Sequence, residues 1–280
     1  MRLITGCGGM LGSYINWPGV MKTDIDELDV TNVKQIAQYT KMPLKAIIHL
    51  AAETDLEECE REPQKAFNVN TFGTYNMLNL AREKDIPFVF ISTAGVFDGK
   101  KNIAYTEEDK PNPINVYGAT KWCADLIVKT YPKHYIFRAS WMMGGGPKKD
   151  KKFVGKIMRK VKFGEKLIYG IVTTMGSPTY AKDLAHTIKQ ALDNKLPYGV
   201  YNCAALNYAS RFEVAQEIIN IMGYKVGVTP VSNAFYDTTD KSHFCQRSTN
   251  EMLAMDKIMG YGYNIPYWKE ALREYLQEWK

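Results

Sequence analysis

Short apolar runs alternate with longer segments whose apolar residues recur at helical spacing through the first half of the chain. The short runs predict strands at residues 2–5, 20–23, 46–50, 88–92 and 135–138, each followed by small or polar residues that turn the chain. The longer segments predict crossover helices at residues 63–84 and 116–130. Since this alternation is typical of a doubly wound parallel sheet, we expect an α/β, Rossmann-like fold.

The pattern changes after Trp141, where Gly144-Gly145-Gly146-Pro147 and a run of lysines follow. We therefore expect a dinucleotide-binding domain at residues 1–145 and a smaller, mainly substrate-binding α/β region at residues 146–280. Segments near residues 176–204 are expected to return to the first domain. The second half predicts helices at residues 183–192, 211–222 and 267–279 and a short strand at residues 226–230.

The 280 residues are enough to bury a full core, and the composition is that of an ordinary globular protein. There is no apolar run of membrane-spanning length and no visible secretory signal, so we expect a cytoplasmic protein that does not bind membranes. The cysteines are odd in number and widely scattered, which favours reduced thiols over a disulfide framework or a metal site.

The net charge of +6 is mild but unevenly distributed. One interpretation of the basic segment is a solvated helix face with its flanking loop, from which one or two side chains reach a diphosphate. Nucleic-acid binding is the alternative that we favour least. The segment comprises Lys148, Lys149, Lys151, Lys152, Lys156, Arg159, Lys160, Lys162 and Lys166.

A glycine-rich turn, Gly6-Cys7-Gly8-Gly9-Met10-Leu11-Gly12, directly follows the first predicted strand. Glycines at Gly6, Gly9 and Gly12 allow a tight turn and let a pyrophosphate approach backbone amides at the start of a helix. The position after a strand predicts a dinucleotide site, and the alternative is a purely structural glycine turn. Only seven residues separate Gly12 from Val20, so the first crossover helix must be very short.

Asp24 lies eighteen residues after Gly6, close to the spacing of a carboxylate that accepts hydrogen bonds from the adenosine ribose. A carboxylate at that place disfavours a 2′-phosphate. The expected cofactor is NADH or NADPH, with a lean toward NADH, although Lys22 is close in sequence. The alternative for Asp24 is a solvated acid at the end of a strand.

Three side chains form the candidate catalytic set. Thr93 falls at the carboxyl end of a predicted strand, and Tyr117 and Lys121 lie one turn apart on the following helix. Tyrosine titrates near pH ~10, so we expect a cationic lysine to lower its pKa and make it a useful acid. Thr93 would hold a substrate carbonyl while Tyr117 protonates its oxygen. The alternative is a helix with a half-buried tyrosine and a surface lysine.

Short motifs over most of the chain carry a family resemblance. They are Leu28-Asp29-Val30-Thr31, His49-Leu50-Ala51-Ala52-Glu53-Thr54-Asp55, Asn68-Val69-Asn70 with Gly73, Ile91-Ser92-Thr93, Val96-Phe97-Asp98-Gly99, Pro111-Asn112-Pro113-Ile114-Asn115-Val116-Tyr117-Gly118, Arg138-Ala139-Ser140-Trp141, Gly176-Ser177-Pro178-Thr179-Tyr180 and Asp183-Leu184-Ala185. With these motifs the chain resembles the extended short-chain dehydrogenase/reductase superfamily and, within it, the dTDP-4-dehydrorhamnose reductase family of deoxysugar biosynthesis.

The resemblance implies an NAD(P)H-dependent oxidoreductase that reduces a nucleoside-diphosphate 4-keto-6-deoxyhexose, with Thr93, Tyr117 and Lys121 as the catalytic residues. It implies substrate contacts at Thr93, Val96, Phe97 and Trp141, although Trp141 could be a buried core indole and Arg138 a structural ion-pair partner. It leaves a homodimer open. The implied cofactor contacts are Gly6, Gly9, Met10, Leu11, Asp24, Asp29, Val30, Leu50, Ala51, Ala52, Asn70, Tyr117 and Lys121.

The chain departs from the family pattern beside the predicted site. Ala94 and Gly95 replace the usual aspartate and aromatic residue after the threonine, and Glu53 replaces an aromatic residue. The usual Arg-Pro-x-x-Ser segment appears only as Gln246-Arg247-Ser248-Thr249-Asn250. We therefore expect an altered pocket beside the nicotinamide, and we predict neither the sugar, the base nor the product configuration.

Two other functions are compatible with the same residues. A nucleotide-sugar epimerase of this superfamily would use the same tyrosine and lysine, whereas a dehydratase needs further acids and bases that Ala94 and Gly95 cannot supply. A non-catalytic NAD(P)-binding regulatory subunit, like that of methionine adenosyltransferase, also resembles this family. The intact catalytic set favours an enzyme.

Overall fold

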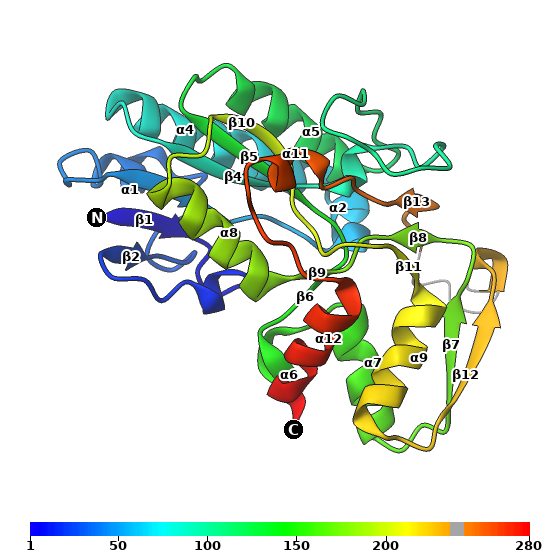
Figure 1. The fold of residues 1–280 in the computed structure, drawn as a ribbon. Helices are drawn as coiled ribbons and strands as arrows, with labels where there is room; N and C mark the ends of the chain where they lie inside the picture. Colours follow the sequence, from blue (N-terminus) through cyan, green and yellow to red (C-terminus); the bar gives the residue numbers. More distant parts are fainter. Residues whose placement is uncertain (236–243) are drawn as a thin grey trace.

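The computed structural model describes residues 1–235 and 244–280, and its centre is a six-stranded parallel sheet (Figure 1). The strand order is β10-β5-β4-β3-β1-β2, which confirms the predicted doubly wound parallel sheet. The five strands predicted in the first half form within a residue of their expected ends, and β10 was not predicted. The strands are β1 (Arg2–Thr5), β2 (Val20–Lys22), β3 (Ala46–His49), β4 (Phe88–Thr93), β5 (His134–Ala139) and β10 (Gly199–Asn202).

Helices cover both faces of this sheet (Figure 1). The first crossover holds only the 3₁₀ turn η1 (Gly12–Tyr14), as the seven-residue spacing predicts. The predicted helix at residues 63–84 is a continuous helical stretch, with a π-helical turn, η2 (Asn68–Phe72), between α3 (Pro63–Phe67) and α4 (Gly73–Glu83). The other helices are α1 (Val33–Ala37), α2 (Leu56–Arg61), α5 (Val116–Lys129) and α8 (Ala181–Asp193), with the 3₁₀ turn η3 (Ala94–Val96) after β4.

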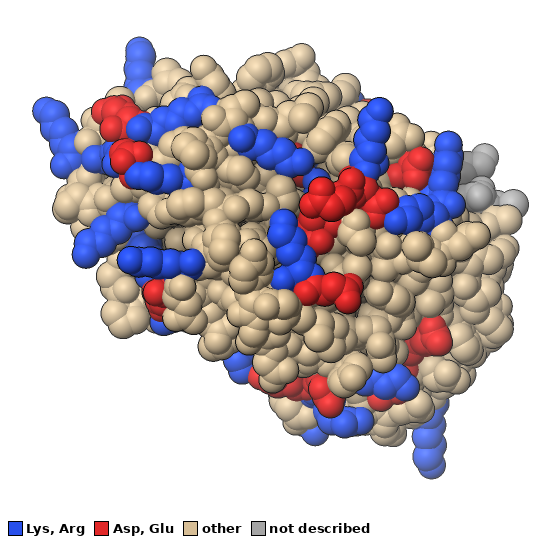
Figure 2. Space-filling model, turned by 45° about the horizontal axis from the view of Figure 1, so that its top comes forward, with Lys and Arg blue, Asp and Glu red and all other residues tan. Residues whose placement is uncertain are grey.

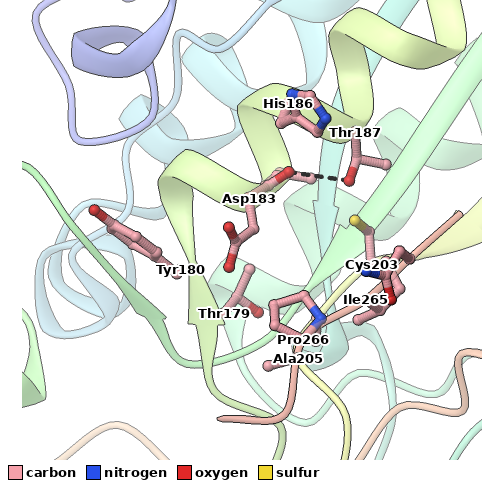
Figure 3. Close-up of a pocket in the computed structure, with 12 residues that line it drawn as sticks. Thr179, Tyr180, Asp183, His186, Thr187, Cys203, Ala205, Ile265 and Pro266 are labelled. Carbon is pink, nitrogen blue, oxygen red and sulfur yellow. Dashed lines mark hydrogen bonds between the residues drawn. The ribbon is translucent and has the colours of Figure 1, made fainter. Parts of the chain in front are cut away.

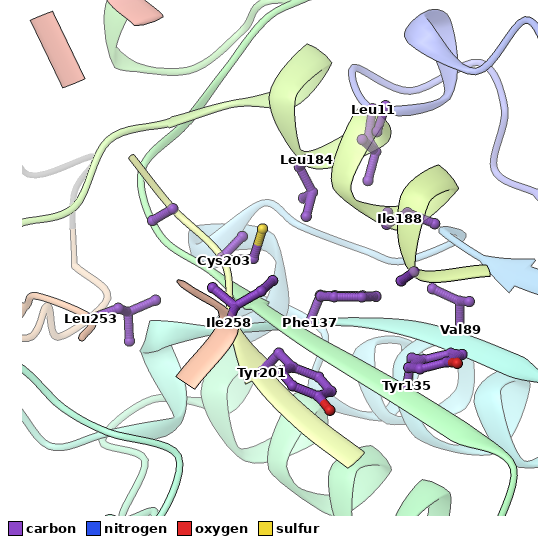
Figure 4. Packing of buried hydrophobic residues seen from close by; sticks show 14 of the residues in the cluster. Leu11, Val89, Tyr135, Phe137, Leu184, Ile188, Tyr201, Cys203, Leu253 and Ile258 are labelled. Atoms are coloured by element: carbon purple, nitrogen blue, oxygen red, sulfur yellow. The ribbon is translucent and has the colours of Figure 1, made fainter. Parts of the chain in front are cut away.

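Successive residues of the central strands point to opposite faces of the sheet, so each face has its own core. Leu3, Ile47 and Phe90 pack under α1, α4 and α5, while Ile4, Ile48 and Val89 pack under α8. Figure 4 shows Leu184 and Ile188 of α8 above Val89 and Phe137 of the sheet. A strand buried on both faces shows a continuous apolar run, which is why β3 and β4 are so plain in the sequence.

The second half of the chain adds a smaller α/β region whose core lies among α7, α9 and α12. Helix α9 begins at the predicted residue, because Ser210 and Glu213 form a capping box there. The elements of this half are β6 (Met142–Met143), α6 (Gly146–Lys149), α7 (Phe153–Lys162), β7 (Leu167–Ile171), β8 (Met175–Gly176), β9 (Thr179–Tyr180), β11 (Ala209–Ser210), α9 (Arg211–Met222), β12 (Gly227–Val231), β13 (Asn250–Glu251), α11 (Asp256–Gly260), α12 (Trp268–Leu276) and η4 (Gln277–Trp279).

The two regions are not divided at one point of the chain, because two elements of its second half, α8 and β10, belong to the large sheet. Strand β10 hydrogen-bonds to β5 at the edge of the large sheet, and α8 packs on that sheet. All five cysteines are free thiols. Across the two described ranges, no helix combines the length and the apolar character that crossing a membrane requires.

Candidate active site

The glycine turn lies where the strand order of the large sheet changes direction. Strand β1 pairs with β2 on one side and β3 on the other, so a crevice opens beyond the carboxyl ends of β1 and β3. Gly6 has φ +67°, and a Cβ there would lie 2.7 Å from Ala51 Cα. Only glycine fits this close approach of the two loops.

The turn presents unpaired backbone donors to that crevice. Among the described residues, the amides of Met10 and Leu11 have no hydrogen-bond acceptor, whereas the Gly9 amide is used within the turn. The Gly8 amide donates to Asp24 Oδ2 at 2.7 Å, so Asp24 ties the turn to the end of β2. Free amides in a glycine turn match the oxygens of a pyrophosphate, and the turn therefore fits a dinucleotide.

Asp24 was predicted to accept hydrogen bonds from a ribose, and its position is compatible with that role. Its second oxygen, Oδ1, accepts only from the Ile25 amide, at 2.9 Å. Each carboxylate oxygen has room for another donor. Lys22, the nearby cation, donates to Asn16 Oδ1 at 2.6 Å.

The remaining predicted cofactor residues divide into loop positions and buried positions. The Leu50 and Ala51 amides donate to Thr5 Oγ1, and with Ala52 these two residues form the partly buried loop after β3. Asp29 Oδ1 accepts from the amide and hydroxyl of Thr31. The Val30 side chain is only 4% exposed and packs in the core, and its predicted contact with the cofactor stays a prediction.

Asn70 is fully buried, and its amide is engaged by protein groups. It accepts from the Glu53 amide at 2.8 Å and donates to the Glu53 carbonyl and to Thr120 Oγ1, each at 3.0 Å. Thr120 in turn donates to the Tyr117 carbonyl at 2.7 Å. Asn70 therefore positions α5 against the loop after β3, and its predicted contact with the cofactor stays a prediction.

Thr93 and Tyr117 are brought together where β4 ends and α5 begins. A Cβ on Gly95 would lie 3.3 Å from Thr93 Oγ1 and 3.9 Å from Tyr117 Cδ1, so the two side chains are neighbours around Gly95. Thr93 Oγ1 accepts from the Gly95 amide at 3.0 Å. A Cβ on Gly118 would lie 2.2 Å from the Gly95 carbonyl oxygen, so the start of α5 lies directly against this turn. Asn115 caps the helix by accepting from the Gly118 amide.

The electrostatics of Tyr117 differ from the prediction. Burial raises the pKa of Tyr117 above its usual value, Cys59 and Glu251 raise it further, and the neighbouring Thr93 hydroxyl lowers it only in part. Lys121 does not contribute to this shift. The expected lowering of the tyrosine pKa by the lysine is therefore wrong for this structure, because removal of the phenol from water outweighs any cation nearby.

Lys121 is buried, with 4% of its surface exposed, and its Nζ lies 4.0 Å from the ring centroid of Phe90 on β4. Burial lowers the pKa of Lys121 to about 7, against the opposing effect of the Asp125 carboxylate. Near neutral pH, the lysine is thus poised between its two protonation states. It is a group of the active-site interior, not the surface lysine of the alternative interpretation.

One turn beyond Lys121, Asp125 forms a fully buried ion pair with Arg138 of β5. Arg138 Nη2 and Nε lie 3.2 and 3.4 Å from Asp125 Oδ2. The guanidinium also lies 5.2 Å from the ring centroid of Phe97. Arg138 is therefore the structural ion-pair partner that the sequence left as an alternative, and it holds α5 on the sheet.

Two predicted substrate contacts are core residues. Val96 and Phe97 have no exposed surface, and Phe97 stacks on Tyr105 with ring centroids 4.2 Å apart. Tyr105 of the following loop covers Phe97, so these two side chains belong to the core. The predicted substrate contacts of Val96 and Phe97 stay a prediction.

Trp141, the fourth predicted substrate residue, is held on several sides by groups that the sequence did not point to. Its backbone has φ +36°, an uncommon conformation for a bulky residue. A Cβ on Gly176 would lie 2.3 Å from the indole, so Gly176 covers one part of the ring system. The indole N–H donates to Glu251, and the Arg211 guanidinium lies 3.6 Å from the ring centroid. No local sequence pattern connects Trp141 with Gly176, Arg211 and Glu251, because these residues lie far apart in the chain.

The basic segment forms the outer surface of α6, α7 and the loops beside them. Its lysines are exposed, whereas Val154, Ile157 and Val161 of α7 are buried. Lys152 crosses to the first region, where its Nζ donates to the Thr54 carbonyl at 2.9 Å. On the face shown in Figure 2, acidic side chains lie among the basic ones. This arrangement agrees with the solvated-face interpretation.

A separate pocket of about 50 Å³, open to solvent, lies between α8 and the segments at residues 203–205 and 264–266 (Figure 3). It holds none of the three catalytic candidates. Asp183 faces it with a buried carboxylate oxygen, Oδ2, that has no hydrogen-bond partner. Burial raises the pKa of Asp183 to about 6, and the Glu274 carboxylate raises it as well.

Replacement of Asp183 by Asn is expected to stabilise the protein above pH ~6.5. The folded-state pKa of about 6 lies above the ordinary 3.8, so ionisation of Asp183 opposes folding as pH rises between these values. We expect a gain in unfolding free energy of about 1–2 kcal/mol at pH 7.5, after allowance for solvent access, and none at pH 4. Urea unfolding at both pH values measures it, with exposed Asp26→Asn as the control. An unchanged stability at pH 7.5 would contradict the prediction.

Comparison with known proteins identifies the family. The RmlD substrate binding domain family matches residues 1–280. The chain belongs to this family. A dTDP-4-dehydrorhamnose reductase of Aggregatibacter actinomycetemcomitans is 30% identical over 289 residues, which cover 97% of this chain and 96% of that protein. The family resemblance of the sequence motifs is thereby confirmed.

Solved structures of similar proteins agree over nearly the full length of this RmlD-family chain. A dTDP-4-dehydrorhamnose reductase from Bacillus anthracis in complex with NADP has a TM-score of 0.91 and 31% identity, covering 99% of this chain and 98% of that one. A dTDP-4-dehydrorhamnose reductase from Clostridium acetobutylicum has a TM-score of 0.90 and 30% identity, covering 99% of both chains. The family fold is thus present from end to end.

Proposed function

We propose that this RmlD-family protein reduces a nucleoside-diphosphate 4-keto-6-deoxyhexose to the 4-hydroxy sugar, with a reduced nicotinamide dinucleotide as co-substrate. The observation that carries the proposal is the pairing of the neighbouring Thr93 and Tyr117 side chains, with Lys121 one turn away, at the same sheet edge as the glycine turn. The names of the similar proteins support the reaction class. The cofactor supplies the hydride when it is bound.

The chain's own residues supply the proton and hold the substrate. The Thr93 hydroxyl lies beside the phenol and can hydrogen-bond the oxygen of a sugar carbonyl. The raised pKa of Tyr117 keeps the phenol protonated at neutral pH, so it can donate a proton to that oxygen. Lys121 bonds the ribose beside the nicotinamide. These roles for Thr93, Tyr117 and Lys121 are part of the proposal.

For the cofactor, the proposal favours NADH over NADPH. Asp24 already accepts from the Gly8 amide at 2.7 Å, which holds its negative charge where the adenosine ribose is expected. A 2′-phosphate at that place would meet like charge, and Lys22 is turned to Asn16. The similar Bacillus anthracis protein was solved with NADP, so the preference needs its own measurement.

The proposal also includes the setting of the enzyme. The free cysteines suit the reducing cytoplasm, where we expect the protein to act. A homodimer stays a prediction. A regulatory subunit without catalysis would have no use for a threonine and a tyrosine side by side near a buried lysine, and this favours the enzyme.

Incubation with a panel of 4-keto-6-deoxy sugar nucleotides, with NADH and NADPH in separate reactions, tests the proposed function. We expect one mole of cofactor to be oxidised per mole of sugar nucleotide, with a kcat/KM at least about tenfold higher with NADH. Product configuration is determined by NMR. Isomerisation without net cofactor oxidation would identify an epimerase instead, and dinucleotide binding without any turnover would identify a regulatory protein.

A further inference from the structure

Arg211 stands out among the charged residues that the proposed reaction does not use. It is the first residue of α9, and it is partly buried beside two aromatic rings. Its guanidinium carbon lies 3.6 Å from the ring centroid of Trp141 and 4.8 Å from that of Phe153. Such stacking fixes the plane of a guanidinium and leaves its N–H groups at the edge.

Those N–H groups have no acceptor in the described part of the chain, where Arg211 forms neither a hydrogen bond nor an ion pair. Burial lowers the pKa of Arg211 to about 10, which leaves the guanidinium fully charged at neutral pH. None of the Arg211 nitrogens is among the buried atoms without a partner, so its free N–H groups remain open to solvent, where an anionic ligand can reach them. Glu251, the carboxylate that raises the pKa of Arg211, is hydrogen-bonded to the Trp141 indole.

The place of Arg211 connects it to the candidate active site. Trp141 lies in the loop that follows β5. The Glu251 carboxylate raises the pKa of both Arg211 and Tyr117. The two other cations near this place are engaged: Arg247 pairs with Glu57, and Lys152 donates to Thr54. Of these three, Arg211 is the one whose donors are unused by the described residues.

We propose that Arg211 binds the diphosphate of the nucleotide sugar through its free N–H edge, and that it sets the preference for diphosphate over monophosphate ligands. This inference rests on the proposed function. A planar guanidinium matches two phosphate oxygens at once, as a lysine does not. Gly176 covers one part of the Trp141 indole, and the Arg211 guanidinium stacks over the centre of the ring. The indole therefore holds the guanidinium in place.

Isothermal titration calorimetry of the whole protein tests this role without any turnover. The probes are dTDP, UDP and GDP, the monophosphate of whichever diphosphate binds tightest, and NADH. In Arg211→Gln, the diphosphate Kd should rise about 10- to 100-fold, the monophosphate Kd less, and the NADH Kd not at all. Arg211→Lys should retain charge but lose the paired contact, with an intermediate rise.

The control is Arg273→Gln, which removes one exposed charge on α12 and should leave every Kd within about twofold. Equal weakening of all three ligands in Arg211→Gln would show a merely structural role and overturn the inference, as would a wild-type protein that binds no diphosphate. Should Arg211→Gln fail to fold, the Arg211→Lys titration decides in the same way. Selective loss of diphosphate binding without any reduction in the substrate panel would refute the proposed function alone.

Discussion

Tyr117→Phe is expected to lower kcat for sugar-nucleotide reduction by about 10³- to 10⁴-fold, because the variant lacks the proton that must reach the carbonyl oxygen. The Tyr117 side chain lies beside that of Thr93, and no other hydroxyl of the candidate set lies on α5 at that edge. The Kd for NADH should change by no more than about twofold, because the ring itself remains. Stopped-flow absorbance at 340 nm and fluorescence titration measure the two quantities.

The matched control for this prediction is Tyr75→Phe on α4, where the tyrosine is 44% exposed and distant in sequence from the site. That variant should have the wild-type kcat. A Tyr117→Phe protein that turns over at the wild-type rate would disprove the catalytic assignment. A protein that loses turnover together with NADH binding would show that Tyr117 organises the cofactor site.

Arg138→Met is expected to destabilise the fold by about 3–5 kcal/mol at pH 8, because it leaves the Asp125 carboxylate buried without its cation. Both side chains of the pair have no exposed surface. Even the intact pair leaves Asp125 Oδ1 and Arg138 Nη1 without partners, so little else can compensate the lone carboxylate. Urea unfolding followed by circular dichroism measures the loss.

The loss should also depend on pH in a definite direction. Without Arg138, the folded-state pKa of Asp125 lies further above its unfolded value, so the folded variant binds an extra proton and its stability falls as pH rises. The deficit should therefore be smaller at pH 5 than at pH 8. The double variant with Asp125→Leu should recover part of it, because no buried charge remains.

Arg2→Met is the control for the ion pair, since the Arg2 and Asp193 side chains are 24% and 34% exposed. An exposed pair of this kind contributes at most about 1 kcal/mol. If Arg138→Met were no more harmful than Arg2→Met, the buried pair would not be holding α5 on β5.

Much of the large sheet could be predicted because its local pattern and its burial agree. Strands β3 and β4 are buried on both faces and are therefore continuous apolar runs. The start of α9 is predictable because Ser210 and Glu213 form a capping box. Strand β10 was missed because it is only four residues long and its two end residues are Gly199 and Asn202. Its place beside β5 depends on the docking of α8, which no local pattern encodes.

The residue types and spacing of Thr93, Tyr117, Lys121 and the glycine turn were determined by the sequence alone, because each follows directly from an adjacent strand or helix. Only the tertiary structure decided their electrostatics, since burial depends on what the rest of the chain places around them. It also decided that Asn70 links the loop after β3 to α5, and that the Val96 and Phe97 side chains are core. The cluster of Arg211, Trp141 and Glu251 joins three elements far apart in sequence, and proximity of that kind arises from packing, not from spacing along the chain.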